Sequence, residues 1–432
     1  MKKLISLALA LVLSLSLIAC GAKQDDTPQT GADTPDTTQT AEKQKLIVGF
    51  DAEFPPFGFI AADGSYDGFD LAMAEELCSR LGWDFEAVPI VWDSKDAELA
   101  AGAAGLSSGL LYVPGKFAPP GEIVELMRVA ARRDRLYATH LRSEGNELLE
   151  ALGETIDCAR EAGLRRLHIS HFKTAGAANW EKLDAALELL EEAQKGGIAV
   201  TVDRYPYTES MTQLSVILPG KAGDLDDSAL SRLLHSTEER EKLALELAAS
   251  CPAAYWKTVT LVSTRSSAGR NHAGQTIAAL AERAGRTPAE FAVELLAEDA
   301  AGTTAAFRGM SPENMRRILG LPFCMMGSDE NARPADDSIG RCHPRGFGSA
   351  ARFLRLRLDA GSPIEAAVRQ MTGLAAETFQ LADRGLVRPG LCADLAAFDP
   401  DEVDGTADFS NPHTPAAGII FTVTGGEFVY RS

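Results

Sequence analysis

The sequence predicts an α/β fold whose main part is an incomplete barrel of parallel strands alternating with helices. After residue 104, apolar stretches typical of strands alternate with amphipathic stretches typical of helices, and three of the strands end at His140, His171 and Asp203. These ends lie 31 and 32 residues apart (140 to 171, 171 to 203), the spacing of repeated strand–helix units. The strands expected are 105–112, 136–140, 166–171, 199–203 and 323–329, which is fewer than the eight of a closed barrel.

The first element of the chain is an export signal over residues 1–20. Lys2 and Lys3 precede an apolar stretch that is too short for a comfortable membrane span and closes on Leu17-Ile18-Ala19-Cys20. This ending resembles a bacterial lipoprotein box, which implies lipidation of Cys20, a membrane anchor and an extracytoplasmic location. An ordinary signal peptide with an incidental Cys20 is the alternative.

Residues 21–45 are expected to form a disordered linker, because they are rich in Thr, Asp, Gln and Pro and have few apolar residues to bury. Next come a strand at 45–51, a turn at 62–65, a helix with Asp70 as its N-cap, and a strand at 83–92.

The motifs VGFDAEFPPFGF and DGSYDGFDLAMAEEL, with the Trp-rich strand after them, resemble the start of bacterial solute-binding proteins for polar amino acids. The resemblance implies an aromatic cleft near Phe54 and Phe57 that covers an amino-acid ligand. It stops by Leu99, so the rest of the first lobe and the second lobe are missing. Aromatic side chains packed in a core fragment are the alternative.

Two histidines end neighbouring strands of the predicted barrel. Chemistry in a βα barrel gathers at the carboxyl ends of the strands, so His140 and His171 could converge on one metal ion. Neutral imidazole is a good zinc ligand. Asp329 ends a later strand, where its carboxylate could take the proton of an attacking water and pass it to a leaving nitrogen.

Longer motifs sharpen this interpretation. GLSSGLLYVPG, YATHLRSEG, HISHFKTAG, DRYPYTES, GSDENARP, HPRGFGS and DRGLVRPGLCADLAAFDP occur in order, and together they resemble N-acyl-D-amino-acid deacylases (D-aminoacylases) of the amidohydrolase superfamily. The resemblance implies a TIM-like barrel of the amidohydrolase type, and zinc-dependent cleavage of an N-acyl-D-amino acid into a carboxylate and a D-amino acid.

Carried over residue by residue, the resemblance implies His140 and His171 as ligands of Zn²⁺ and Asp329 as the catalytic acid/base. Arg345 becomes the clamp for the substrate's α-carboxylate, which suits a bidentate guanidinium. Tyr112, Lys173 and, more weakly, Ser210 are placed beside the substrate.

Several other candidates receive no catalytic role. His168 is expected to point away from His171, His343 to shape the loop that holds Arg345, and Asp203 to serve a barrel layer or a turn. Arg142 and Glu144 are read as either supports of the site or a surface salt bridge. Cys324 and Cys342 are not expected to bind metal.

Composition excludes one class of partner. The net charge is −19, so a general phosphate-binding surface is not expected and nucleic acid is excluded as a partner. Besides Cys20, the six cysteines form no CxxC pair and suggest no disulfide framework, as in a reducing compartment. The hydrolase half alone would therefore suit the cytoplasm.

The predicted organisation is thus a series of parts: signal peptide 1–20, linker 21–45, partial solute-binding lobe 46–99, partial barrel 100–390 with an inserted small domain at 212–321, and β-sandwich strands 391–432. The hydrolase family also carries an HxH motif on its first strand, and no HxH occurs in this sequence. Three interpretations remain open: a hydrolase with impaired activity, a truncated amino-acid-binding lipoprotein of an ABC importer, and a gene-model, assembly or recombination chimera joined near residues 97–105.

Overall fold

A computed structural model describes residues 45–50, 53–54, 58–61, 63–81, 84–89, 103–269, 271–331, 334–336 and 341–432. The chain divides into two compact units, Met1–Ala104 and Gly105–Ser432. The predicted signal peptide with Cys20, nearly all of the linker, Phe57 and residues 97–102 of the predicted join lie outside the described residues. No helix within the described ranges is long and apolar enough to cross a membrane.

The first unit contains a parallel strand pair joined through a helix. β1 (Lys45–Phe50) pairs with β5 (Asp84–Pro89), and α1 (Phe69–Leu81) lies between them in the sequence. β2 (Glu53–Phe54), β3 (Gly58–Ile60) and β4 (Tyr66–Asp67) form a separate antiparallel sheet, with the predicted turn between β3 and β4. The prediction that Asp70 is an N-cap is wrong, because the helix already begins at Phe69.

The second unit is built on a five-stranded parallel sheet, which confirms the five strands expected from the sequence, although those expected over 105–112, 166–171 and 323–329 end earlier, at Gly109, Ile169 and Met326. Its order is β13-β9-β8-β7-β6. The strands are β6 (Gly105–Gly109), β7 (Leu136–His140), β8 (Arg166–Ile169), β9 (Ala199–Arg204) and β13 (Cys324–Met326). β6 and β13 are the edges, so this sheet is an open arc.

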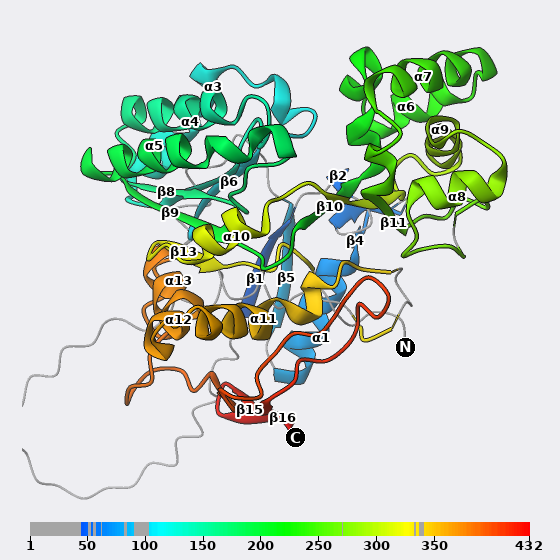
Figure 1. Ribbon diagram of the computed structural model, residues 1–432. Coiled ribbons are helices and arrows are strands. Elements are labelled where there is room, and N and C mark those ends of the chain that lie inside the picture. The colour runs from blue at the N-terminus through cyan, green and yellow to red at the C-terminus, as the bar shows by residue number, and fades with distance from the viewer. Residues whose placement is uncertain are drawn as a thin grey trace, which may run out of the picture. The chain divides into compact units, whose positions relative to one another are not determined.

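Three helices cover one face of this sheet, as Figure 1 shows in cyan and green. They are α3 (Pro120–Arg132), α4 (Leu148–Ala162) and α5 (Leu183–Lys195). Pro120 begins α3 at a position where its missing N–H costs no hydrogen bond, and α4 ends at Gly163 with a left-handed φ of 68°. Apolar residues of the three helices and of the strands between them form one buried core, to which α10 (Pro312–Leu319) adds Ile318.

A small domain interrupts the chain between β9 and β13. β10 (Glu209–Gln213), β12 (Thr304–Arg308) and β11 (Val259–Ser263) form an antiparallel sheet. It is accompanied by α6 (Asp227–Leu234), α7 (Thr237–Ser250), α8 (Ile277–Ala284) and α9 (Pro288–Glu298). Helices α6 and α7 are separate, because Ser236 starts α7 by accepting a hydrogen bond from the backbone N–H of Glu239.

The chain ends with three helices and a small sheet. The helices are α11 (Arg345–Asp359), α12 (Ile364–Met371) and α13 (Gly373–Thr378). The sheet contains β14 (Leu395–Phe398), β15 (Ile419–Thr424) and β16 (Glu427–Arg431). Gly425 and Gly426 form the turn between β15 and β16, where their φ values of 59° and 89° require a left-handed backbone that glycine adopts without strain.

Candidate functional site

The carboxyl edge of the five-stranded sheet gathers polar side chains from neighbouring strands. His140 is the last residue of β7, His171 follows β8 by two residues, and Asp203 lies near the end of β9. Asp329 follows β13 by three residues. Because all of these strands are parallel, their ends meet at one edge, and this is where chemistry is expected in a βα barrel.

The two predicted metal ligands lie against each other. Nδ1 of His140 is 2.6 Å from Nε2 of His171, and the ring centroids are 4.2 Å apart. Burial and the neighbouring His171 lower the pKa of His140 to about 4, although Asp329 and Glu144 partly oppose this shift. His140 is therefore neutral at physiological pH, which is the form that binds a metal ion.

A buried ionic cluster holds the other side of the His171 ring. Oε1 of Glu144 lies 2.6 Å from Nδ1 of His171 and 2.5 Å from Nζ of Lys173. Burial raises the pKa of Glu144, but Lys173 and His171 outweigh this effect and hold that pKa well below its usual range. Glu144 is thus an ionised part of the site, and the surface salt bridge considered from the sequence is wrong for this residue. Arg142, by contrast, pairs with Glu154 at 2.9 Å.

Two residues of the site have a backbone conformation that side chains disfavour. His171 has φ 38° and Asp329 has φ 51°, and both values lie in the left-handed region. Such strained residues persist only where the surrounding structure holds them, and they concentrate at functional sites.

The predicted catalytic acid and the predicted carboxylate clamp are ion-paired. Nη1 of Arg345 lies 2.8 Å from Oδ2 of Asp329, and the guanidinium packs 4.7 Å from the ring centroid of Tyr205. Arg345 is the first residue of α11, and His343 accepts its backbone N–H at 2.9 Å. This hydrogen bond is the loop-shaping contact expected of His343.

The remaining predicted substrate residues divide into two groups. Lys173 belongs to the buried cluster at His171, and the ring of Tyr112 lies 6.1 Å from that of His140. Ser210 instead lies in β10, opposite Phe307, in the sheet of the small domain. The structure therefore places Tyr112 and Lys173 beside the histidines, whereas Ser210 belongs to a different sheet.

Sequence reasoning missed a hydrogen-bonded pair beside His171. Nε2 of His168 lies 2.8 Å from Oδ2 of Asp203, and Oδ1 of Asp203 accepts the backbone N–H of His171 at 3.1 Å. His168 therefore reaches the network of the site rather than pointing away from it. The sequence holds only part of the signal: Thr201 and Asp203 lie two apart on one strand and share a face, but nothing in the sequence shows that His168 lies beside Thr201.

The donor set at this edge fits zinc in kind but falls short in number. Imidazole nitrogen suits zinc, and two imidazoles meet here. Within the ranges that the structure describes, no group of three or more His, Cys, Asp or Glu side chains is arranged to hold a metal ion. Burial raises the pKa of the Cys324 thiol, so that thiol stays protonated.

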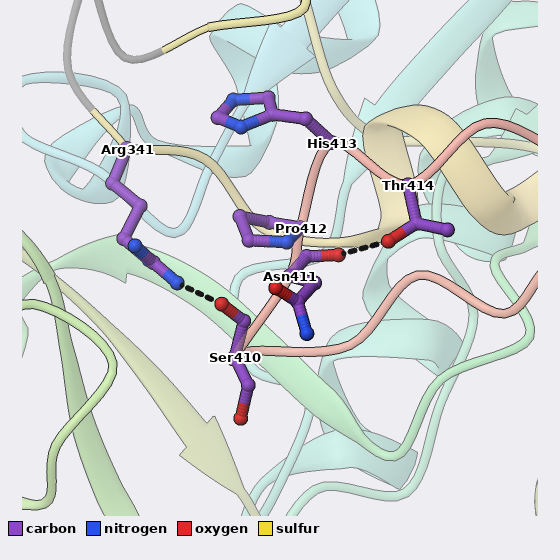
Figure 2. A pocket seen from close by; sticks show the side chains of 6 residues that line it. All are labelled: Arg341, Ser410, Asn411, Pro412, His413 and Thr414. Carbon is purple, nitrogen blue, oxygen red and sulfur yellow. Dashed lines mark hydrogen bonds between the residues drawn. The ribbon is translucent and has the colours of Figure 1, made fainter.

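A separate hollow of about 380 Å³ lies at the surface of the second unit. Figure 2 shows Arg341 reaching the chain at Ser410, whose carbonyl oxygen accepts a hydrogen bond at 2.6 Å. The other residues that line the hollow are Asn411, Pro412, His413 and Thr414. None of the predicted site residues lines this hollow.

Comparison with curated proteins finds relatives of both parts of the chain. The second unit accounts for most of the match to the N-acyl-D-glutamate deacylase of Alcaligenes xylosoxydans xylosoxydans, which is 33% identical over 334 residues, or 77% of this chain and 59% of the relative. The D-aminoacylase of the same organism is 31% identical over 351 residues, or 80% of this chain and 62% of the relative. The chain thus spans about three fifths of the length of these relatives.

Solved structures give a similar result. The N-acyl-D-glutamate deacylase from Bordetella bronchiseptica, complexed with zinc and a phosphonate inhibitor, aligns with a TM-score of 0.66 at 26% identity. The alignment covers 90% of this chain and 79% of that one. A D-aminoacylase crystal structure aligns with a TM-score of 0.64 at 26% identity, covering 90% of this chain and 80% of that one.

The N-terminal part has relatives of another kind. The family of bacterial extracellular solute-binding proteins, family 3, matches residues 46–113. The match continues past Leu99, where the resemblance was expected to stop. The L-cystine-binding protein TcyJ of Escherichia coli (strain K12) is 36% identical over 58 residues, which are 13% of this chain and 22% of that protein. The chain is therefore similar to an N-acyl-D-glutamate deacylase over 77% of its length, and residues 46–113 are similar to bacterial extracellular solute-binding proteins.

Proposed function

We propose that residues 105–432 carry a zinc-dependent site of the N-acyl-D-amino-acid deacylase type, with low activity in this chain. The reaction would cleave the amide bond of an N-acyl-D-amino acid to give a carboxylate and a D-amino acid. The single observation that carries this proposal is the meeting of His140 and His171 at the carboxyl edge of the sheet, with N···N 2.6 Å. The deacylase relatives supply the substrate class.

Arg345 and Asp329 would divide the work on the substrate. The guanidinium of Arg345 would bind the α-carboxylate of the amino acid. It would also keep its ion pair with Asp329, whose Oδ2 lies 2.8 Å from Nη1 of Arg345. Asp329 takes the proton of the attacking water and delivers it to the leaving nitrogen. Tyr112 and Lys173 flank the histidines and would contact the rest of the substrate.

Zinc, when bound, would polarise the amide carbonyl and stabilise the negative charge that develops there. His140 and His171 would hold it. A catalytic zinc site has three protein ligands as a rule. The HxH motif expected on the first strand of the deacylase family, which would add ligands, does not occur in this sequence. We therefore propose weak zinc binding and slow turnover.

A single-turnover assay tests this function. N-acetyl-D-glutamate and excess enzyme would be mixed with zinc, and release of the free amine would be followed. We expect slow release that is lost in His171→Ala and Asp329→Asn. Asp299→Asn is the matched control, because Asp299 is a buried carboxylate of the small domain. Release at the same rate in all four proteins would show that the reaction does not use this site.

Amino-acid binding is the alternative function, and the observation that raises it is the solute-binding match at residues 46–113. We propose that this segment does not bind amino acids by itself, because the match ends before a second lobe could enclose a ligand. Calorimetric titration with free L-amino acids, L-cystine among them, should give no saturable heat. Saturable heat on titration with L-cystine would contradict this proposal and show that the segment binds an amino acid.

The location of the chain is a separate proposal. We propose that Cys20 is lipidated and anchors the chain to the outer side of the cell membrane. Labelled palmitate should be incorporated into the full chain and not into Cys20→Ser. Equal labelling of the two proteins would exclude Cys20 as the anchor.

We also propose that the chain is a chimera joined near residues 97–105. Its support is that the solute-binding match ends at residue 113, whereas the deacylase match covers 77% of the chain. Sequencing reads that span the codons for Lys95 to Leu106 in source DNA are the test. Reads that cross the join without interruption would exclude an assembly chimera, and their absence would support one.

A further inference from the structure

The strongest unassigned feature of the second unit is the contact between two neighbouring strands at His168 and Asp203. His168 is 3% exposed, and its Nε2 lies 2.8 Å from Oδ2 of Asp203. The other carboxylate oxygen, Oδ1, accepts the backbone N–H of His171 at 3.1 Å. One carboxylate thus connects a buried imidazole with the backbone of a proposed metal ligand.

The strand register fixes His168 from its other side. His168 pairs with Thr201 across β8 and β9, and its Nδ1 lies 2.9 Å from Oγ1 of Thr201. Leu167 and Ile169, on either side of His168 in β8, are buried in the core under the helices. Because side chains alternate along a strand, the His168 ring lies on the face of the sheet opposite these helices. Both ring nitrogens are therefore engaged, and the ring has one orientation.

Asp203 is confined as well. A Cβ at Gly327 would lie only 2.4 Å from its Oδ1, so the backbone of the neighbouring strand end packs directly on the carboxylate. The backbone carbonyl of Asp203 also accepts the N–H of Phe172 at 2.9 Å. Two successive N–H groups after β8 are thus bound by one residue of β9.

This fixation matters because of the conformation of His171. Its φ of 38° is unfavourable for a residue with a side chain, and a hydrogen bond to its N–H from a rigid partner opposes relaxation. In this conformation Nε2 of His171 lies 2.6 Å from Nδ1 of His140. Relaxation of the backbone would swing the imidazole away from that partner.

We infer that His168 and Asp203 are positioning residues, which hold the backbone of His171 so that its imidazole meets that of His140. The inference rests on the proposed function, because it concerns the same metal site. Partners that orient metal ligands in this way change metal affinity by about 10–100-fold when they are removed.

Two kinds of variant separate positioning from general destabilisation. Asp203→Ala and His168→Ala remove the connection. Asp203→Asn keeps an oxygen for the N–H of His171, and His168→Gln keeps a donor for Asp203. The matched control is Asp299→Ala, because Asp299 is also a buried carboxylate and accepts a backbone N–H, that of Arg265, at 2.7 Å.

The first readout needs no metal. The rate at which diethyl pyrocarbonate modifies His171 would be followed by mass spectrometry in metal-free protein under conditions where each variant is folded by circular dichroism. We expect modification to be at least about tenfold faster in the two Ala variants, and close to the wild-type rate in Asp203→Asn, His168→Gln and Asp299→Ala. Should Asp203→Ala not fold, the comparison of His168→Ala with His168→Gln and wild type still decides the positioning role, and should His168→Ala not fold, the comparison of Asp203→Ala with Asp203→Asn and wild type decides it.

The second readout is Co²⁺ affinity from its visible absorption. We expect a loss of about 10–100-fold in the Ala variants, with recovery in the two conservative ones. Unchanged protection of His171 in folded Asp203→Ala and His168→Ala would overturn the positioning role. If wild type binds no Co²⁺ while the Ala variants expose His171, the proposed metal site fails and the positioning role stands.

Discussion

The two units contain the same local pattern, a helix between parallel strands, but they bury very different cores. In the first unit α1 has 13 residues, and its described buried apolar residues are Leu71, Ala74 and Cys78. In the second unit α4 has 15 residues, eight of which are buried, and it packs between two further helices over the sheet. The comparison teaches that the number of side chains an amphipathic helix buries depends on how many neighbouring strands and helices it packs against.

The largest expected effect is on stability. Leu152→Ala in α4 removes a fully buried side chain from the main core and should lower the free energy of unfolding of the second unit by about 2–5 kcal/mol. The matched change in the first unit, Leu71→Ala, should leave this transition unmoved. Urea unfolding followed by circular dichroism measures both, and equal shifts of one common transition would mean that the two units share a core.

The next effect is a pH dependence of the second unit without metal. The pKa of His140 is lowered to about 4 in the folded chain, so between its ordinary value near 6.5 and about 4 the unfolded chain binds more protons. The free energy of unfolding should therefore fall as pH falls through this window, by on the order of 2–3 kcal/mol.

Urea midpoints from pH 7 to pH 4.5 in the presence of a chelator measure this dependence. His140→Gln is the control, because it removes the titrating group and keeps a polar side chain. It should flatten the curve within this window. An unchanged slope in His140→Gln would assign the dependence to other groups.

The smallest effect concerns a helix cap inside the second unit. Thr287 accepts the backbone N–H of Glu290, whose side chain binds the backbone of Thr287 in return. Thr287→Ala should destabilise α9 by about 1 kcal/mol, less than the core substitution, because it removes one cap and no buried volume. Hydrogen exchange of the first turn of α9 would detect the loss, and Thr287→Ser should retain protection.

The sequence was sufficient to predict the parallel sheet, because apolar periodicity marks each strand and the strand ends repeat at a constant interval. It also predicted that His140 and His171 converge, since parallel strands end at one edge. The antiparallel sheet of the small domain was not predicted, because its strands come from distant segments, 209–213 and 304–308. The role of His168 depends on its register with Thr201, and a residue considered on one strand alone does not reveal its partner on the next.

The most direct test of the metal site is a Co²⁺ titration of the whole chain, with the visible absorption spectrum as the signal. Wild type should develop a saturable absorption with weak affinity, and both His140→Ala and His171→Ala should abolish it. His235→Ala, at an exposed histidine of the small domain, should leave it intact. Absorption that persists unchanged in both site variants would contradict a metal site at His140 and His171.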